Sequence, residues 1–192
     1  MNSTNPFIYS DANKRYHTLN YYNKSSFNSK VFKAVVDAGF TCPNKDGTKG
    51  TGGCIYCMGG SGYFTEKSDG EIYDSVKRQL AAEKERIYKK HPDSLITAYF
   101  QANTNTYAPV ATLKEAYTAA LDFGVHGISI GTRADCLPDD VIALLCDINS
   151  KTHLTVELGL QTIHDKSAQI INRCYSYDEF LEGYRKLQES GI

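Results

Sequence analysis

The sequence VFKAVVDAGFTCPNKDGTKGTGGCIYC, residues 31–57, decides the fold class. Residues 31–36 are mostly apolar and rich in β-branched side chains, so they predict a buried strand. The polar, glycine-rich segment that follows runs from Gly39 to about Ser68 and is too long for a simple connection. Because it also holds Cys42, Cys54 and Cys57, we expect it to have a chemical role.

Three further strands alternate with helices along the rest of the chain. The strands are predicted at residues 95–100, 127–130 and 154–160, and the helices at 68–91, 112–123, 138–148, 164–172 and 176–190. Capping boxes are predicted for Ser68 with Glu71, Thr112 with Glu115 and Ser176 with Glu179. Four β-α units in a row indicate an α/β fold with parallel strands and right-handed crossovers. A partial (β/α) barrel is therefore expected, with functional residues at the carboxyl ends of its strands.

The two ends of the chain differ in pattern. Residues 1–30 show no clear periodicity and predict an irregular lead-in to the domain at residues 31–192. The last residues, 186–192, are typical of a helix end, a glycine cap and the first residue of a fifth strand. This pattern predicts a fragment that is truncated near the start of the fifth strand.

Composition limits the class of protein. The 192 residues are 41% hydrophobic and carry a net charge of −1, which predicts a soluble globular protein without a general attraction to nucleic acid or membranes. No apolar run approaches the roughly 18 residues that span a bilayer, and the polar N-terminus lacks a secretory signal. A cytoplasmic location without a membrane partner is expected. In that reducing compartment, the six cysteines are better suited to bind metal than to form disulfides.

The clustered thiols allow three interpretations. Three thiolates can hold a [4Fe-4S] cluster with one iron left open, and neighbouring glycines let the loop wrap closely around it. A structural zinc site would need a fourth ligand, for which Cys136 and His17 are candidates without ligand spacing. Alternatively, the three cysteines are unrelated buried side chains. The scattered Cys136, Cys146 and Cys174 are expected to be structural.

Residues 35–44, together with 52–57, resemble the opening of a radical S-adenosylmethionine (SAM) protein. The similarity is to the YhcC-type family, close to the elongator catalytic subunit. It implies a [4Fe-4S] cluster on Cys42, Cys54 and Cys57, SAM as a second cofactor, and four βα units of a six-unit core. The commonest spacing in the superfamily is Cys-x3-Cys-x2-Cys. The first gap here is eleven residues, as in other members of this subgroup with long gaps.

The resemblance also implies contacts to SAM. Tyr56 matches an aromatic residue that packs near the adenine. Gln161, in the segment VELGLQT at residues 156–162, matches a glutamine that hydrogen-bonds the ribose. Arg173 matches an arginine that holds the methionine carboxylate, a task that suits the guanidinium fork. The alternative for Tyr56 is an ordinary loop aromatic residue, and without the resemblance Gln161 and Arg173 would be surface groups.

Two further segments depart from the relatives' motifs. Gly131 replaces a glutamate, so an acidic ribose contact is absent there. Arg133 is expected either to face the cofactor or substrate, or to form a salt bridge with Asp135 or Glu157. After the second strand, Gln101 and Asn103 are candidate polar contacts to SAM, with a solvated loop as the alternative.

The activity that the resemblance implies is reductive cleavage of SAM to a 5′-deoxyadenosyl radical. It also implies an external one-electron donor of the flavodoxin or ferredoxin type. The substrate is not identified; the elongator relation points to tRNA, but the densest basic stretch, residues 84–91, is expected to be a solvated helix face. The alternatives are a zinc-stabilised nucleic-acid-binding module and an inactive truncated paralogue.

Overall fold

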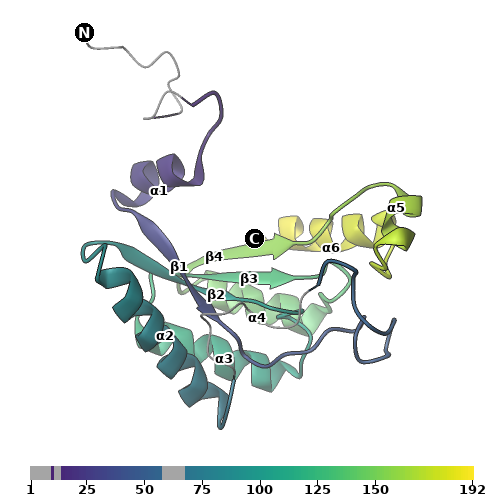
Figure 1. Ribbon diagram of the computed structural model, residues 1–192, viewed down its shortest axis with the longest axis horizontal. Coiled ribbons are helices and arrows are strands. Elements are labelled where there is room, and N and C mark those ends of the chain that lie inside the picture. The colour runs from purple at the N-terminus through teal and green to yellow at the C-terminus, as the bar shows by residue number, and fades with distance from the viewer. Residues whose placement is uncertain (1–9, 11–13, 58–67) are drawn as a thin grey trace.

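Four parallel strands form one sheet in the order β1-β2-β3-β4. The strands are β1 (Val31–Val36), β2 (Leu95–Phe100), β3 (Gly127–Thr132) and β4 (His153–Leu158). The computed structural model describes residues 10, 14–57 and 68–192. Its helices are α1 (Leu19–Phe27), α2 (Ile72–Tyr88), α3 (Val110–Phe123), α4 (Asp139–Asn149), α5 (Asp165–Ile170) and α6 (Tyr177–Glu189). Helices α2, α3 and α4 lie along one face of the sheet (Figure 1), so the predicted partial (β/α) barrel is confirmed.

The two faces of the sheet differ in chemistry. Val36, Phe100 and Ile130 are neighbours in register and are fully buried on the face that packs against the helices. The opposite face carries the residues that alternate with these along each strand, including the charged Lys33 and Glu157. Period-two alternation thus builds an apolar core on one side and a polar surface on the other. That polar surface is unusual, because both faces of parallel sheets are usually covered by apolar packing.

Two helices begin at residues other than those the sequence predicts. In α2 the N-cap is Glu71, whose side chain makes no capping bond, so the predicted capping box with Ser68 is wrong. Helix α3 already begins after Pro109, ahead of the predicted cap at Thr112. The Pro109 carbonyl accepts from the Thr112 and Leu113 amides at 2.9 and 3.1 Å, so the first turn of α3 forms without a side-chain cap.

Helix α1 was not expected. It shows that the prediction of an irregular segment at residues 1–30 is wrong for residues 19–27. Its N-cap is Thr18, whose hydroxyl accepts a hydrogen bond from the Tyr21 amide at 3.0 Å. The ring of Phe27 packs edge-on against His126 at 4.3 Å and His153 at 5.1 Å between ring centroids. Tertiary packing against the start of β3 and β4, rather than apolar periodicity, therefore holds this helix.

The packing of α1 predicts a pH-dependent stability. Burial, and then the charge of His153, lower the pKa of His126, whose Nε2 is buried without a hydrogen-bond partner. The folded state favours neutral His126. The contribution of this residue to folding stability is therefore complete above the unfolded-state pKa near 6.5. It is lost as pH falls towards the lower pKa of the folded state. We expect the urea midpoint to fall between pH 7.5 and 5.5, and to fall less in His126→Phe. An equal fall in both proteins would contradict this assignment.

Helix α6 begins with the predicted capping box, which is confirmed. The Ser176 hydroxyl accepts from the Glu179 amide at 3.1 Å, and the Glu179 carboxylate accepts from the Ser176 amide at 2.7 Å. Further along, Gly183 packs directly on the backbone after β3. A Cβ at this position would lie 2.1 Å from the carbonyl oxygen of Ala134. The helix can approach the site edge this closely only because residue 183 has no side chain.

Replacing Gly183 with alanine is therefore expected to destabilise the fold, by about 1–3 kcal/mol or more, since overpacking forces backbone shifts. Urea unfolding followed by circular dichroism measures the change. Glu182→Ala, an exposed neighbour on the same helix, is the matched control and should be nearly neutral. Equal stability of Gly183→Ala and the unsubstituted protein would show that α6 does not pack this closely.

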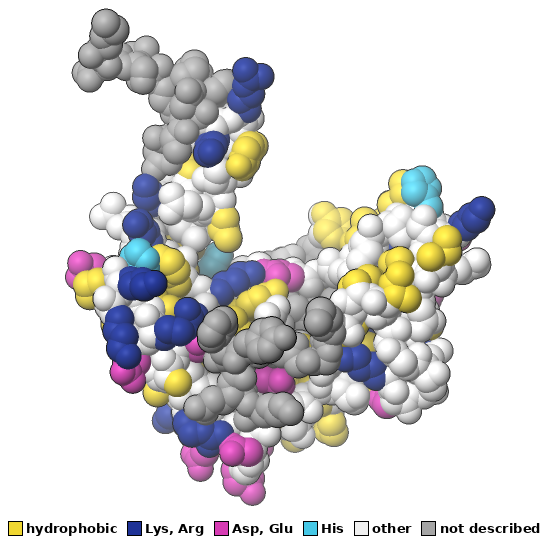
Figure 2. Space-filling model, in the orientation of Figure 1, with side chains coloured by type: hydrophobic (Ala, Val, Ile, Leu, Met, Phe, Trp, Pro, Cys, Tyr) yellow, Lys and Arg dark blue, Asp and Glu magenta, His cyan; other side chains and the backbone are white. Residues whose placement is uncertain are grey.

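Basic and acidic side chains are intermixed over α2 on the face that Figure 2 shows. Ion pairs such as Arg86 with Glu83 and Lys89 with Glu85 contribute to this pattern. The stretch at residues 84–91 is thus a mixed-charge helix face rather than a continuous basic stripe. In the described ranges, every helix is too short or too polar to cross a membrane.

Candidate cluster and cofactor site

The predicted site residues follow the carboxyl ends of the four strands, which meet at one edge of the sheet. The loop that carries the cysteines reaches this edge beside α5 (Figure 1), where the Ile55 amide donates to the Ile171 carbonyl at 3.1 Å. Segments about 120 residues apart in the chain are therefore in direct contact. This is the edge at which (β/α) barrels place their active sites.

Backbone turns shape the cysteine loop. The carbonyl of Cys42 accepts from the Lys45 amide at 2.8 Å, and the carbonyl of Cys54 accepts from the Cys57 amide at 2.8 Å. Gly52 and Gly53 have φ values of 78° and 76°, which glycine adopts without strain. The Cys-x2-Cys pair therefore occupies one tight turn.

The three thiols are free and partly exposed, and their chemistry suits an iron–sulfur cluster. Within the described part of the chain, no three Cys, His, Asp or Glu side chains are grouped to hold a metal ion. The geometry therefore gives no support to a compact zinc site. A four-iron cluster is broader than a single ion, and its ligands lie further apart. Cys42, Cys54 and Cys57 thus remain the predicted cluster ligands on the strength of residue type and loop position.

Positive charge lies close to Cys42 at the end of β3. The guanidinium of Arg133 is 8% exposed and donates to both carboxylate oxygens of Asp135, at 2.9 and 2.8 Å. Burial alone would lower the pKa of Arg133, but the hydrogen bonds and charge of Asp135 outweigh it, and the nearby Cys42 thiolate raises the pKa further. The Arg133–Asp135 ion pair therefore lies near a predicted cluster ligand.

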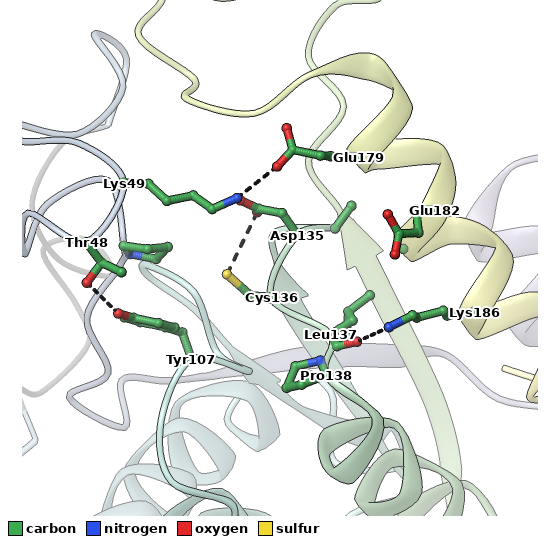
Figure 3. A pocket seen from close by; sticks show the side chains of 13 residues that line it. Thr48, Lys49, Tyr107, Asp135, Cys136, Leu137, Pro138, Glu179, Glu182 and Lys186 are labelled. Carbon is green, nitrogen blue, oxygen red and sulfur yellow. Dashed lines mark hydrogen bonds and ion pairs between the residues drawn. The ribbon is translucent and has the colours of Figure 1, made fainter.

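A second cation approaches Asp135 from the cysteine loop. Lys49 Nζ lies 2.7 Å from Asp135 and 2.9 Å from Glu179 of α6 (Figure 3). Burial opposes ionisation of Asp135, but the hydrogen bonds from Arg133 and Lys49 keep its pKa below the ordinary value. The ion pairs of Asp135 and Glu179 thus fasten the cysteine loop to β3 and α6.

A cavity of about 400 Å³ opens beneath these ion pairs, between the cysteine loop and α6 (Figure 3). Its lining includes Lys49, Tyr107, Cys136, Glu179 and Lys186. The thiol of Cys136 is 7% exposed, and burial followed by the charge of Asp135 raises its pKa to about 12. Cys136 is therefore a buried thiol at the wall of this cavity, and its structural role stays a prediction.

The salt bridge proposed as an alternative for Arg133 is the one observed. Its guanidinium also donates to the Arg173 carbonyl at 2.9 Å and lies 4.7 Å from the Tyr175 ring centroid. These partners occupy the guanidinium in this structure, and a contact from Arg133 to SAM or the substrate stays a prediction. Glu157, the other predicted partner, instead pairs with Lys33.

Arg173 lies buried at the turn after β4. The residue is 1% exposed and donates to the carbonyls of Leu160 at 2.7 Å and Thr162 at 2.5 Å. Two more bonds, at 3.0 and 2.8 Å, reach the Tyr175 carbonyl. These bonds use four of the five N–H groups of a guanidinium. Arg173 therefore stabilises the turn after β4, and its contact to the methionine carboxylate stays a prediction.

Tyr56 and Gln161 both lie exposed at the predicted edge. Burial, and then hydrogen bonding to Cys54 and its charge, raise the pKa of Tyr56. The amide of Gln161, with its nitrogen turned towards the backbone, donates to the Gly159 carbonyl at 2.7 Å. Tyr56 is thus beside a predicted cluster ligand, and Gln161 keeps its other amide atom available. Their contacts to adenine and ribose stay predictions.

Asn103 and Gln101 follow β2. Asn103 donates from Nδ2 to the Phe40 carbonyl at 2.8 Å and accepts from Lys45 Nζ at 2.7 Å. It therefore joins the cysteine loop to the loop after β2, and its contact to SAM stays a prediction. The backbone amide of Gln101 donates to the Val36 carbonyl at 3.2 Å. The residue is half-buried at the same edge. A contact from Gln101 to SAM stays a prediction.

The polar face of the sheet carries a charged cluster that the sequence analysis did not recognise. Glu157 accepts from Lys33, from the Tyr99 hydroxyl at 2.9 Å and from the Ser129 hydroxyl at 3.1 Å. Lys33 Nζ also lies 3.8 Å from the Tyr99 ring centroid. Burial and then Glu157 raise the pKa of Tyr99 to about 12. Alternation within single strands hints at these residues, but only strand register brings them together.

A further missed feature is the polar contact between α5 and the cysteine loop. The amide of Asn172 donates to the carbonyls of Thr51 at 3.3 Å and Gly53 at 2.8 Å. Asn44 is fully buried and donates to the Asn172 carbonyl and to the Cys54 sulfur at 3.5 Å. Asn44 stands close to Cys42 in the sequence, which is a local signal. Asn172 gives none, because its partners are about 120 residues away.

Comparison with known proteins agrees with this arrangement. A family model described as the Radical SAM superfamily matches residues 46–192, and the chain therefore belongs to this superfamily. It is 48% identical over 194 residues to the "Uncharacterized protein YtqA" of Bacillus subtilis, covering 100% of this chain and 59% of that protein. "Protein YhcC" of Escherichia coli is 38% identical over 153 residues, which are 79% of this chain and 47% of that protein.

A third relative is the "Uncharacterized protein MJ0486" of Methanocaldococcus jannaschii, 33% identical over 178 residues, with 89% of this chain and 52% of that protein covered. The resemblance to the YhcC-type family is thus confirmed. The chain spans about half the length of the curated relatives it matches.

Proposed function

We propose that this chain binds a [4Fe-4S] cluster through Cys42, Cys54 and Cys57 and supports reductive cleavage of SAM. The observation that carries this proposal is the position of three free, partly exposed cysteines in a glycine-rich loop at the carboxyl edge of a radical SAM sheet. When bound, such a cluster supplies one electron to SAM, which yields methionine and a 5′-deoxyadenosyl radical.

The protein's own groups bind and orient the cofactors. The ion pairs of Arg133 and Lys49 with Asp135 fasten the cysteine loop to the end of β3, and the contacts of Asn172 hold that loop against the segment after α5. Tyr56 is proposed to flank the adenine and Gln161 to bond the ribose. Arg173, which also bonds the backbone carbonyls after β4, is the proposed donor to the methionine carboxylate.

The electron is proposed to come from an external donor of the flavodoxin or ferredoxin type. For the substrate, the polar face with Lys33, Tyr99 and Glu157 supplies hydrogen-bonding groups on the side of the sheet away from α2, α3 and α4. The intermixed charges over α2 add nothing in favour of a tRNA substrate.

Anaerobic reconstitution with iron and sulfide, followed by dithionite and SAM, tests the proposal. We expect 5′-deoxyadenosine and methionine in equal amounts. A folded, cluster-loaded chain that forms neither product would favour the inactive paralogue. A colourless protein with about one zinc per chain would favour the zinc-stabilised module.

A further inference from the structure

The Asn44 side chain is fully buried within the cysteine loop, although amides usually lie at the surface. The loop is folded around its backbone, since the Asn44 carbonyl accepts from the Gly53 amide at 2.8 Å. Its side-chain nitrogen donates to the Asn172 carbonyl and lies 3.5 Å from the Cys54 sulfur. Asn44 therefore links the predicted cluster ligand to the segment after α5.

The orientation of this amide is determined by its neighbours. The Asn172 carbonyl can only accept, so the nitrogen of Asn44 must face it and the adjoining Cys54 sulfur. The amide oxygen Oδ1 then points away and is buried without a partner. This oxygen lies close to Gly50, since a Cβ at position 50 would be only 2.3 Å from Oδ1. The glycine at position 50 thus lets the amide keep a geometry that leaves one polar atom unsatisfied.

A buried, unsatisfied amide oxygen costs free energy, so this placement needs a compensating contact. A hydrogen bond to the Asn172 carbonyl does not by itself require a buried amide, because a side-chain donor at the surface of the loop could also make it. The contact to the sulfur has a distinct consequence, because donors to cysteine sulfurs help set the reduction potential of iron–sulfur clusters. A donor withdraws negative charge from the thiolate, and this stabilises the reduced, more negative state.

We infer that Asn44 is a positioning residue that donates an N–H···S hydrogen bond to Cys54 and thereby raises the reduction potential of the cluster. This inference rests on the proposed function, since it requires Cys54 to ligate iron. It assigns different tasks to the two asparagines in contact. Asn44 acts on the sulfur, whereas the Asn172 side chain bonds only loop carbonyls and Cys174.

Potentiometric titration of the reconstituted protein, followed by electron paramagnetic resonance (EPR), tests this inference without measuring activity. Asn44→Ala is expected to shift the midpoint potential to a lower value, because the donor is lost. Asn172→Gly is the matched control: glycine tolerates the φ of 54° at this position, and the variant loosens the same loop without removing a donor to sulfur. Its potential should stay near that of the unsubstituted protein.

An unchanged potential in Asn44→Ala, or an equal shift in both variants, would overturn the inference. If Asn44→Ala fails to load iron, Asn44→Leu retains a neutral side chain of similar size, removes the donor and must also titrate at a lower potential. Failure of the unsubstituted protein to load iron would instead count against the proposed function. The two failures are thus distinguishable by the iron content of the unsubstituted protein.

Discussion

Substituting Cys54 with serine is expected to abolish assembly of the iron–sulfur cluster. Cys54 shares its tight turn with Cys57, and its sulfur lies in contact with Asn44. A serine oxygen is a harder ligand than a thiolate and does not suit iron–sulfur chemistry. After anaerobic reconstitution, the iron content should fall from about four per chain to near zero, and the brown colour should be lost.

Cys146→Ser provides the control for this experiment. Cys146 lies in α4, where its thiol contacts the Ser190 carbonyl, remote in sequence from the cysteine loop. This variant should load iron like the unsubstituted protein. Full loading of Cys54→Ser, or equal loss in both variants, would contradict the assignment of the cluster to the loop.

Removing the guanidinium of Arg173 is expected to unfold the edge of the sheet after β4. In Arg173→Met, the carbonyls of Leu160, Thr162 and Tyr175 lose their donors. A fully buried carbonyl without a partner costs about 1–3 kcal/mol. Because the bonds to Leu160 and Thr162 are only partly buried, we expect a loss towards the lower end of the sum, roughly 3–5 kcal/mol, in the free energy of unfolding. Urea denaturation measures it.

Arg173→Lys refines this experiment. Lysine retains the positive charge but cannot direct a planar fork at separate carbonyls, so its stability should also be low. If Arg173 only bound a carboxylate of SAM, Arg173→Met would keep its stability and lose affinity for SAM. Near-normal stability of both variants would therefore favour binding of the methionine carboxylate as the main role of Arg173.

The architecture was predictable because its signals are local. Buried parallel strands such as residues 95–100 form short apolar runs, and the helices between them show period-3.6 faces. The capping box of Ser176 and Glu179 is likewise complete within four residues. Helix α1 was missed because Phe27 is held by His126 and His153, which are about a hundred residues away. Tertiary packing of this kind leaves no periodic signal.

The candidate site was predictable in location but less so in the role of each side chain. Resemblance placed Arg173 and Arg133 near the cofactors, and both do lie at the correct edge. Spacing alone could not show that their guanidinium groups are filled by carbonyls and by Asp135. The Lys33–Glu157 pair depends on strand register across the whole sheet, so it required the structure.

The most direct test of the central claim is the EPR spectrum of the reconstituted, dithionite-reduced protein, recorded with and without SAM. A cluster held by only Cys42, Cys54 and Cys57 has one iron open to SAM, so its spectrum should change on addition of the cofactor. The same spectrum before and after addition, in a folded chain with about four irons, would contradict the claim. It would show that the cluster has no site for SAM.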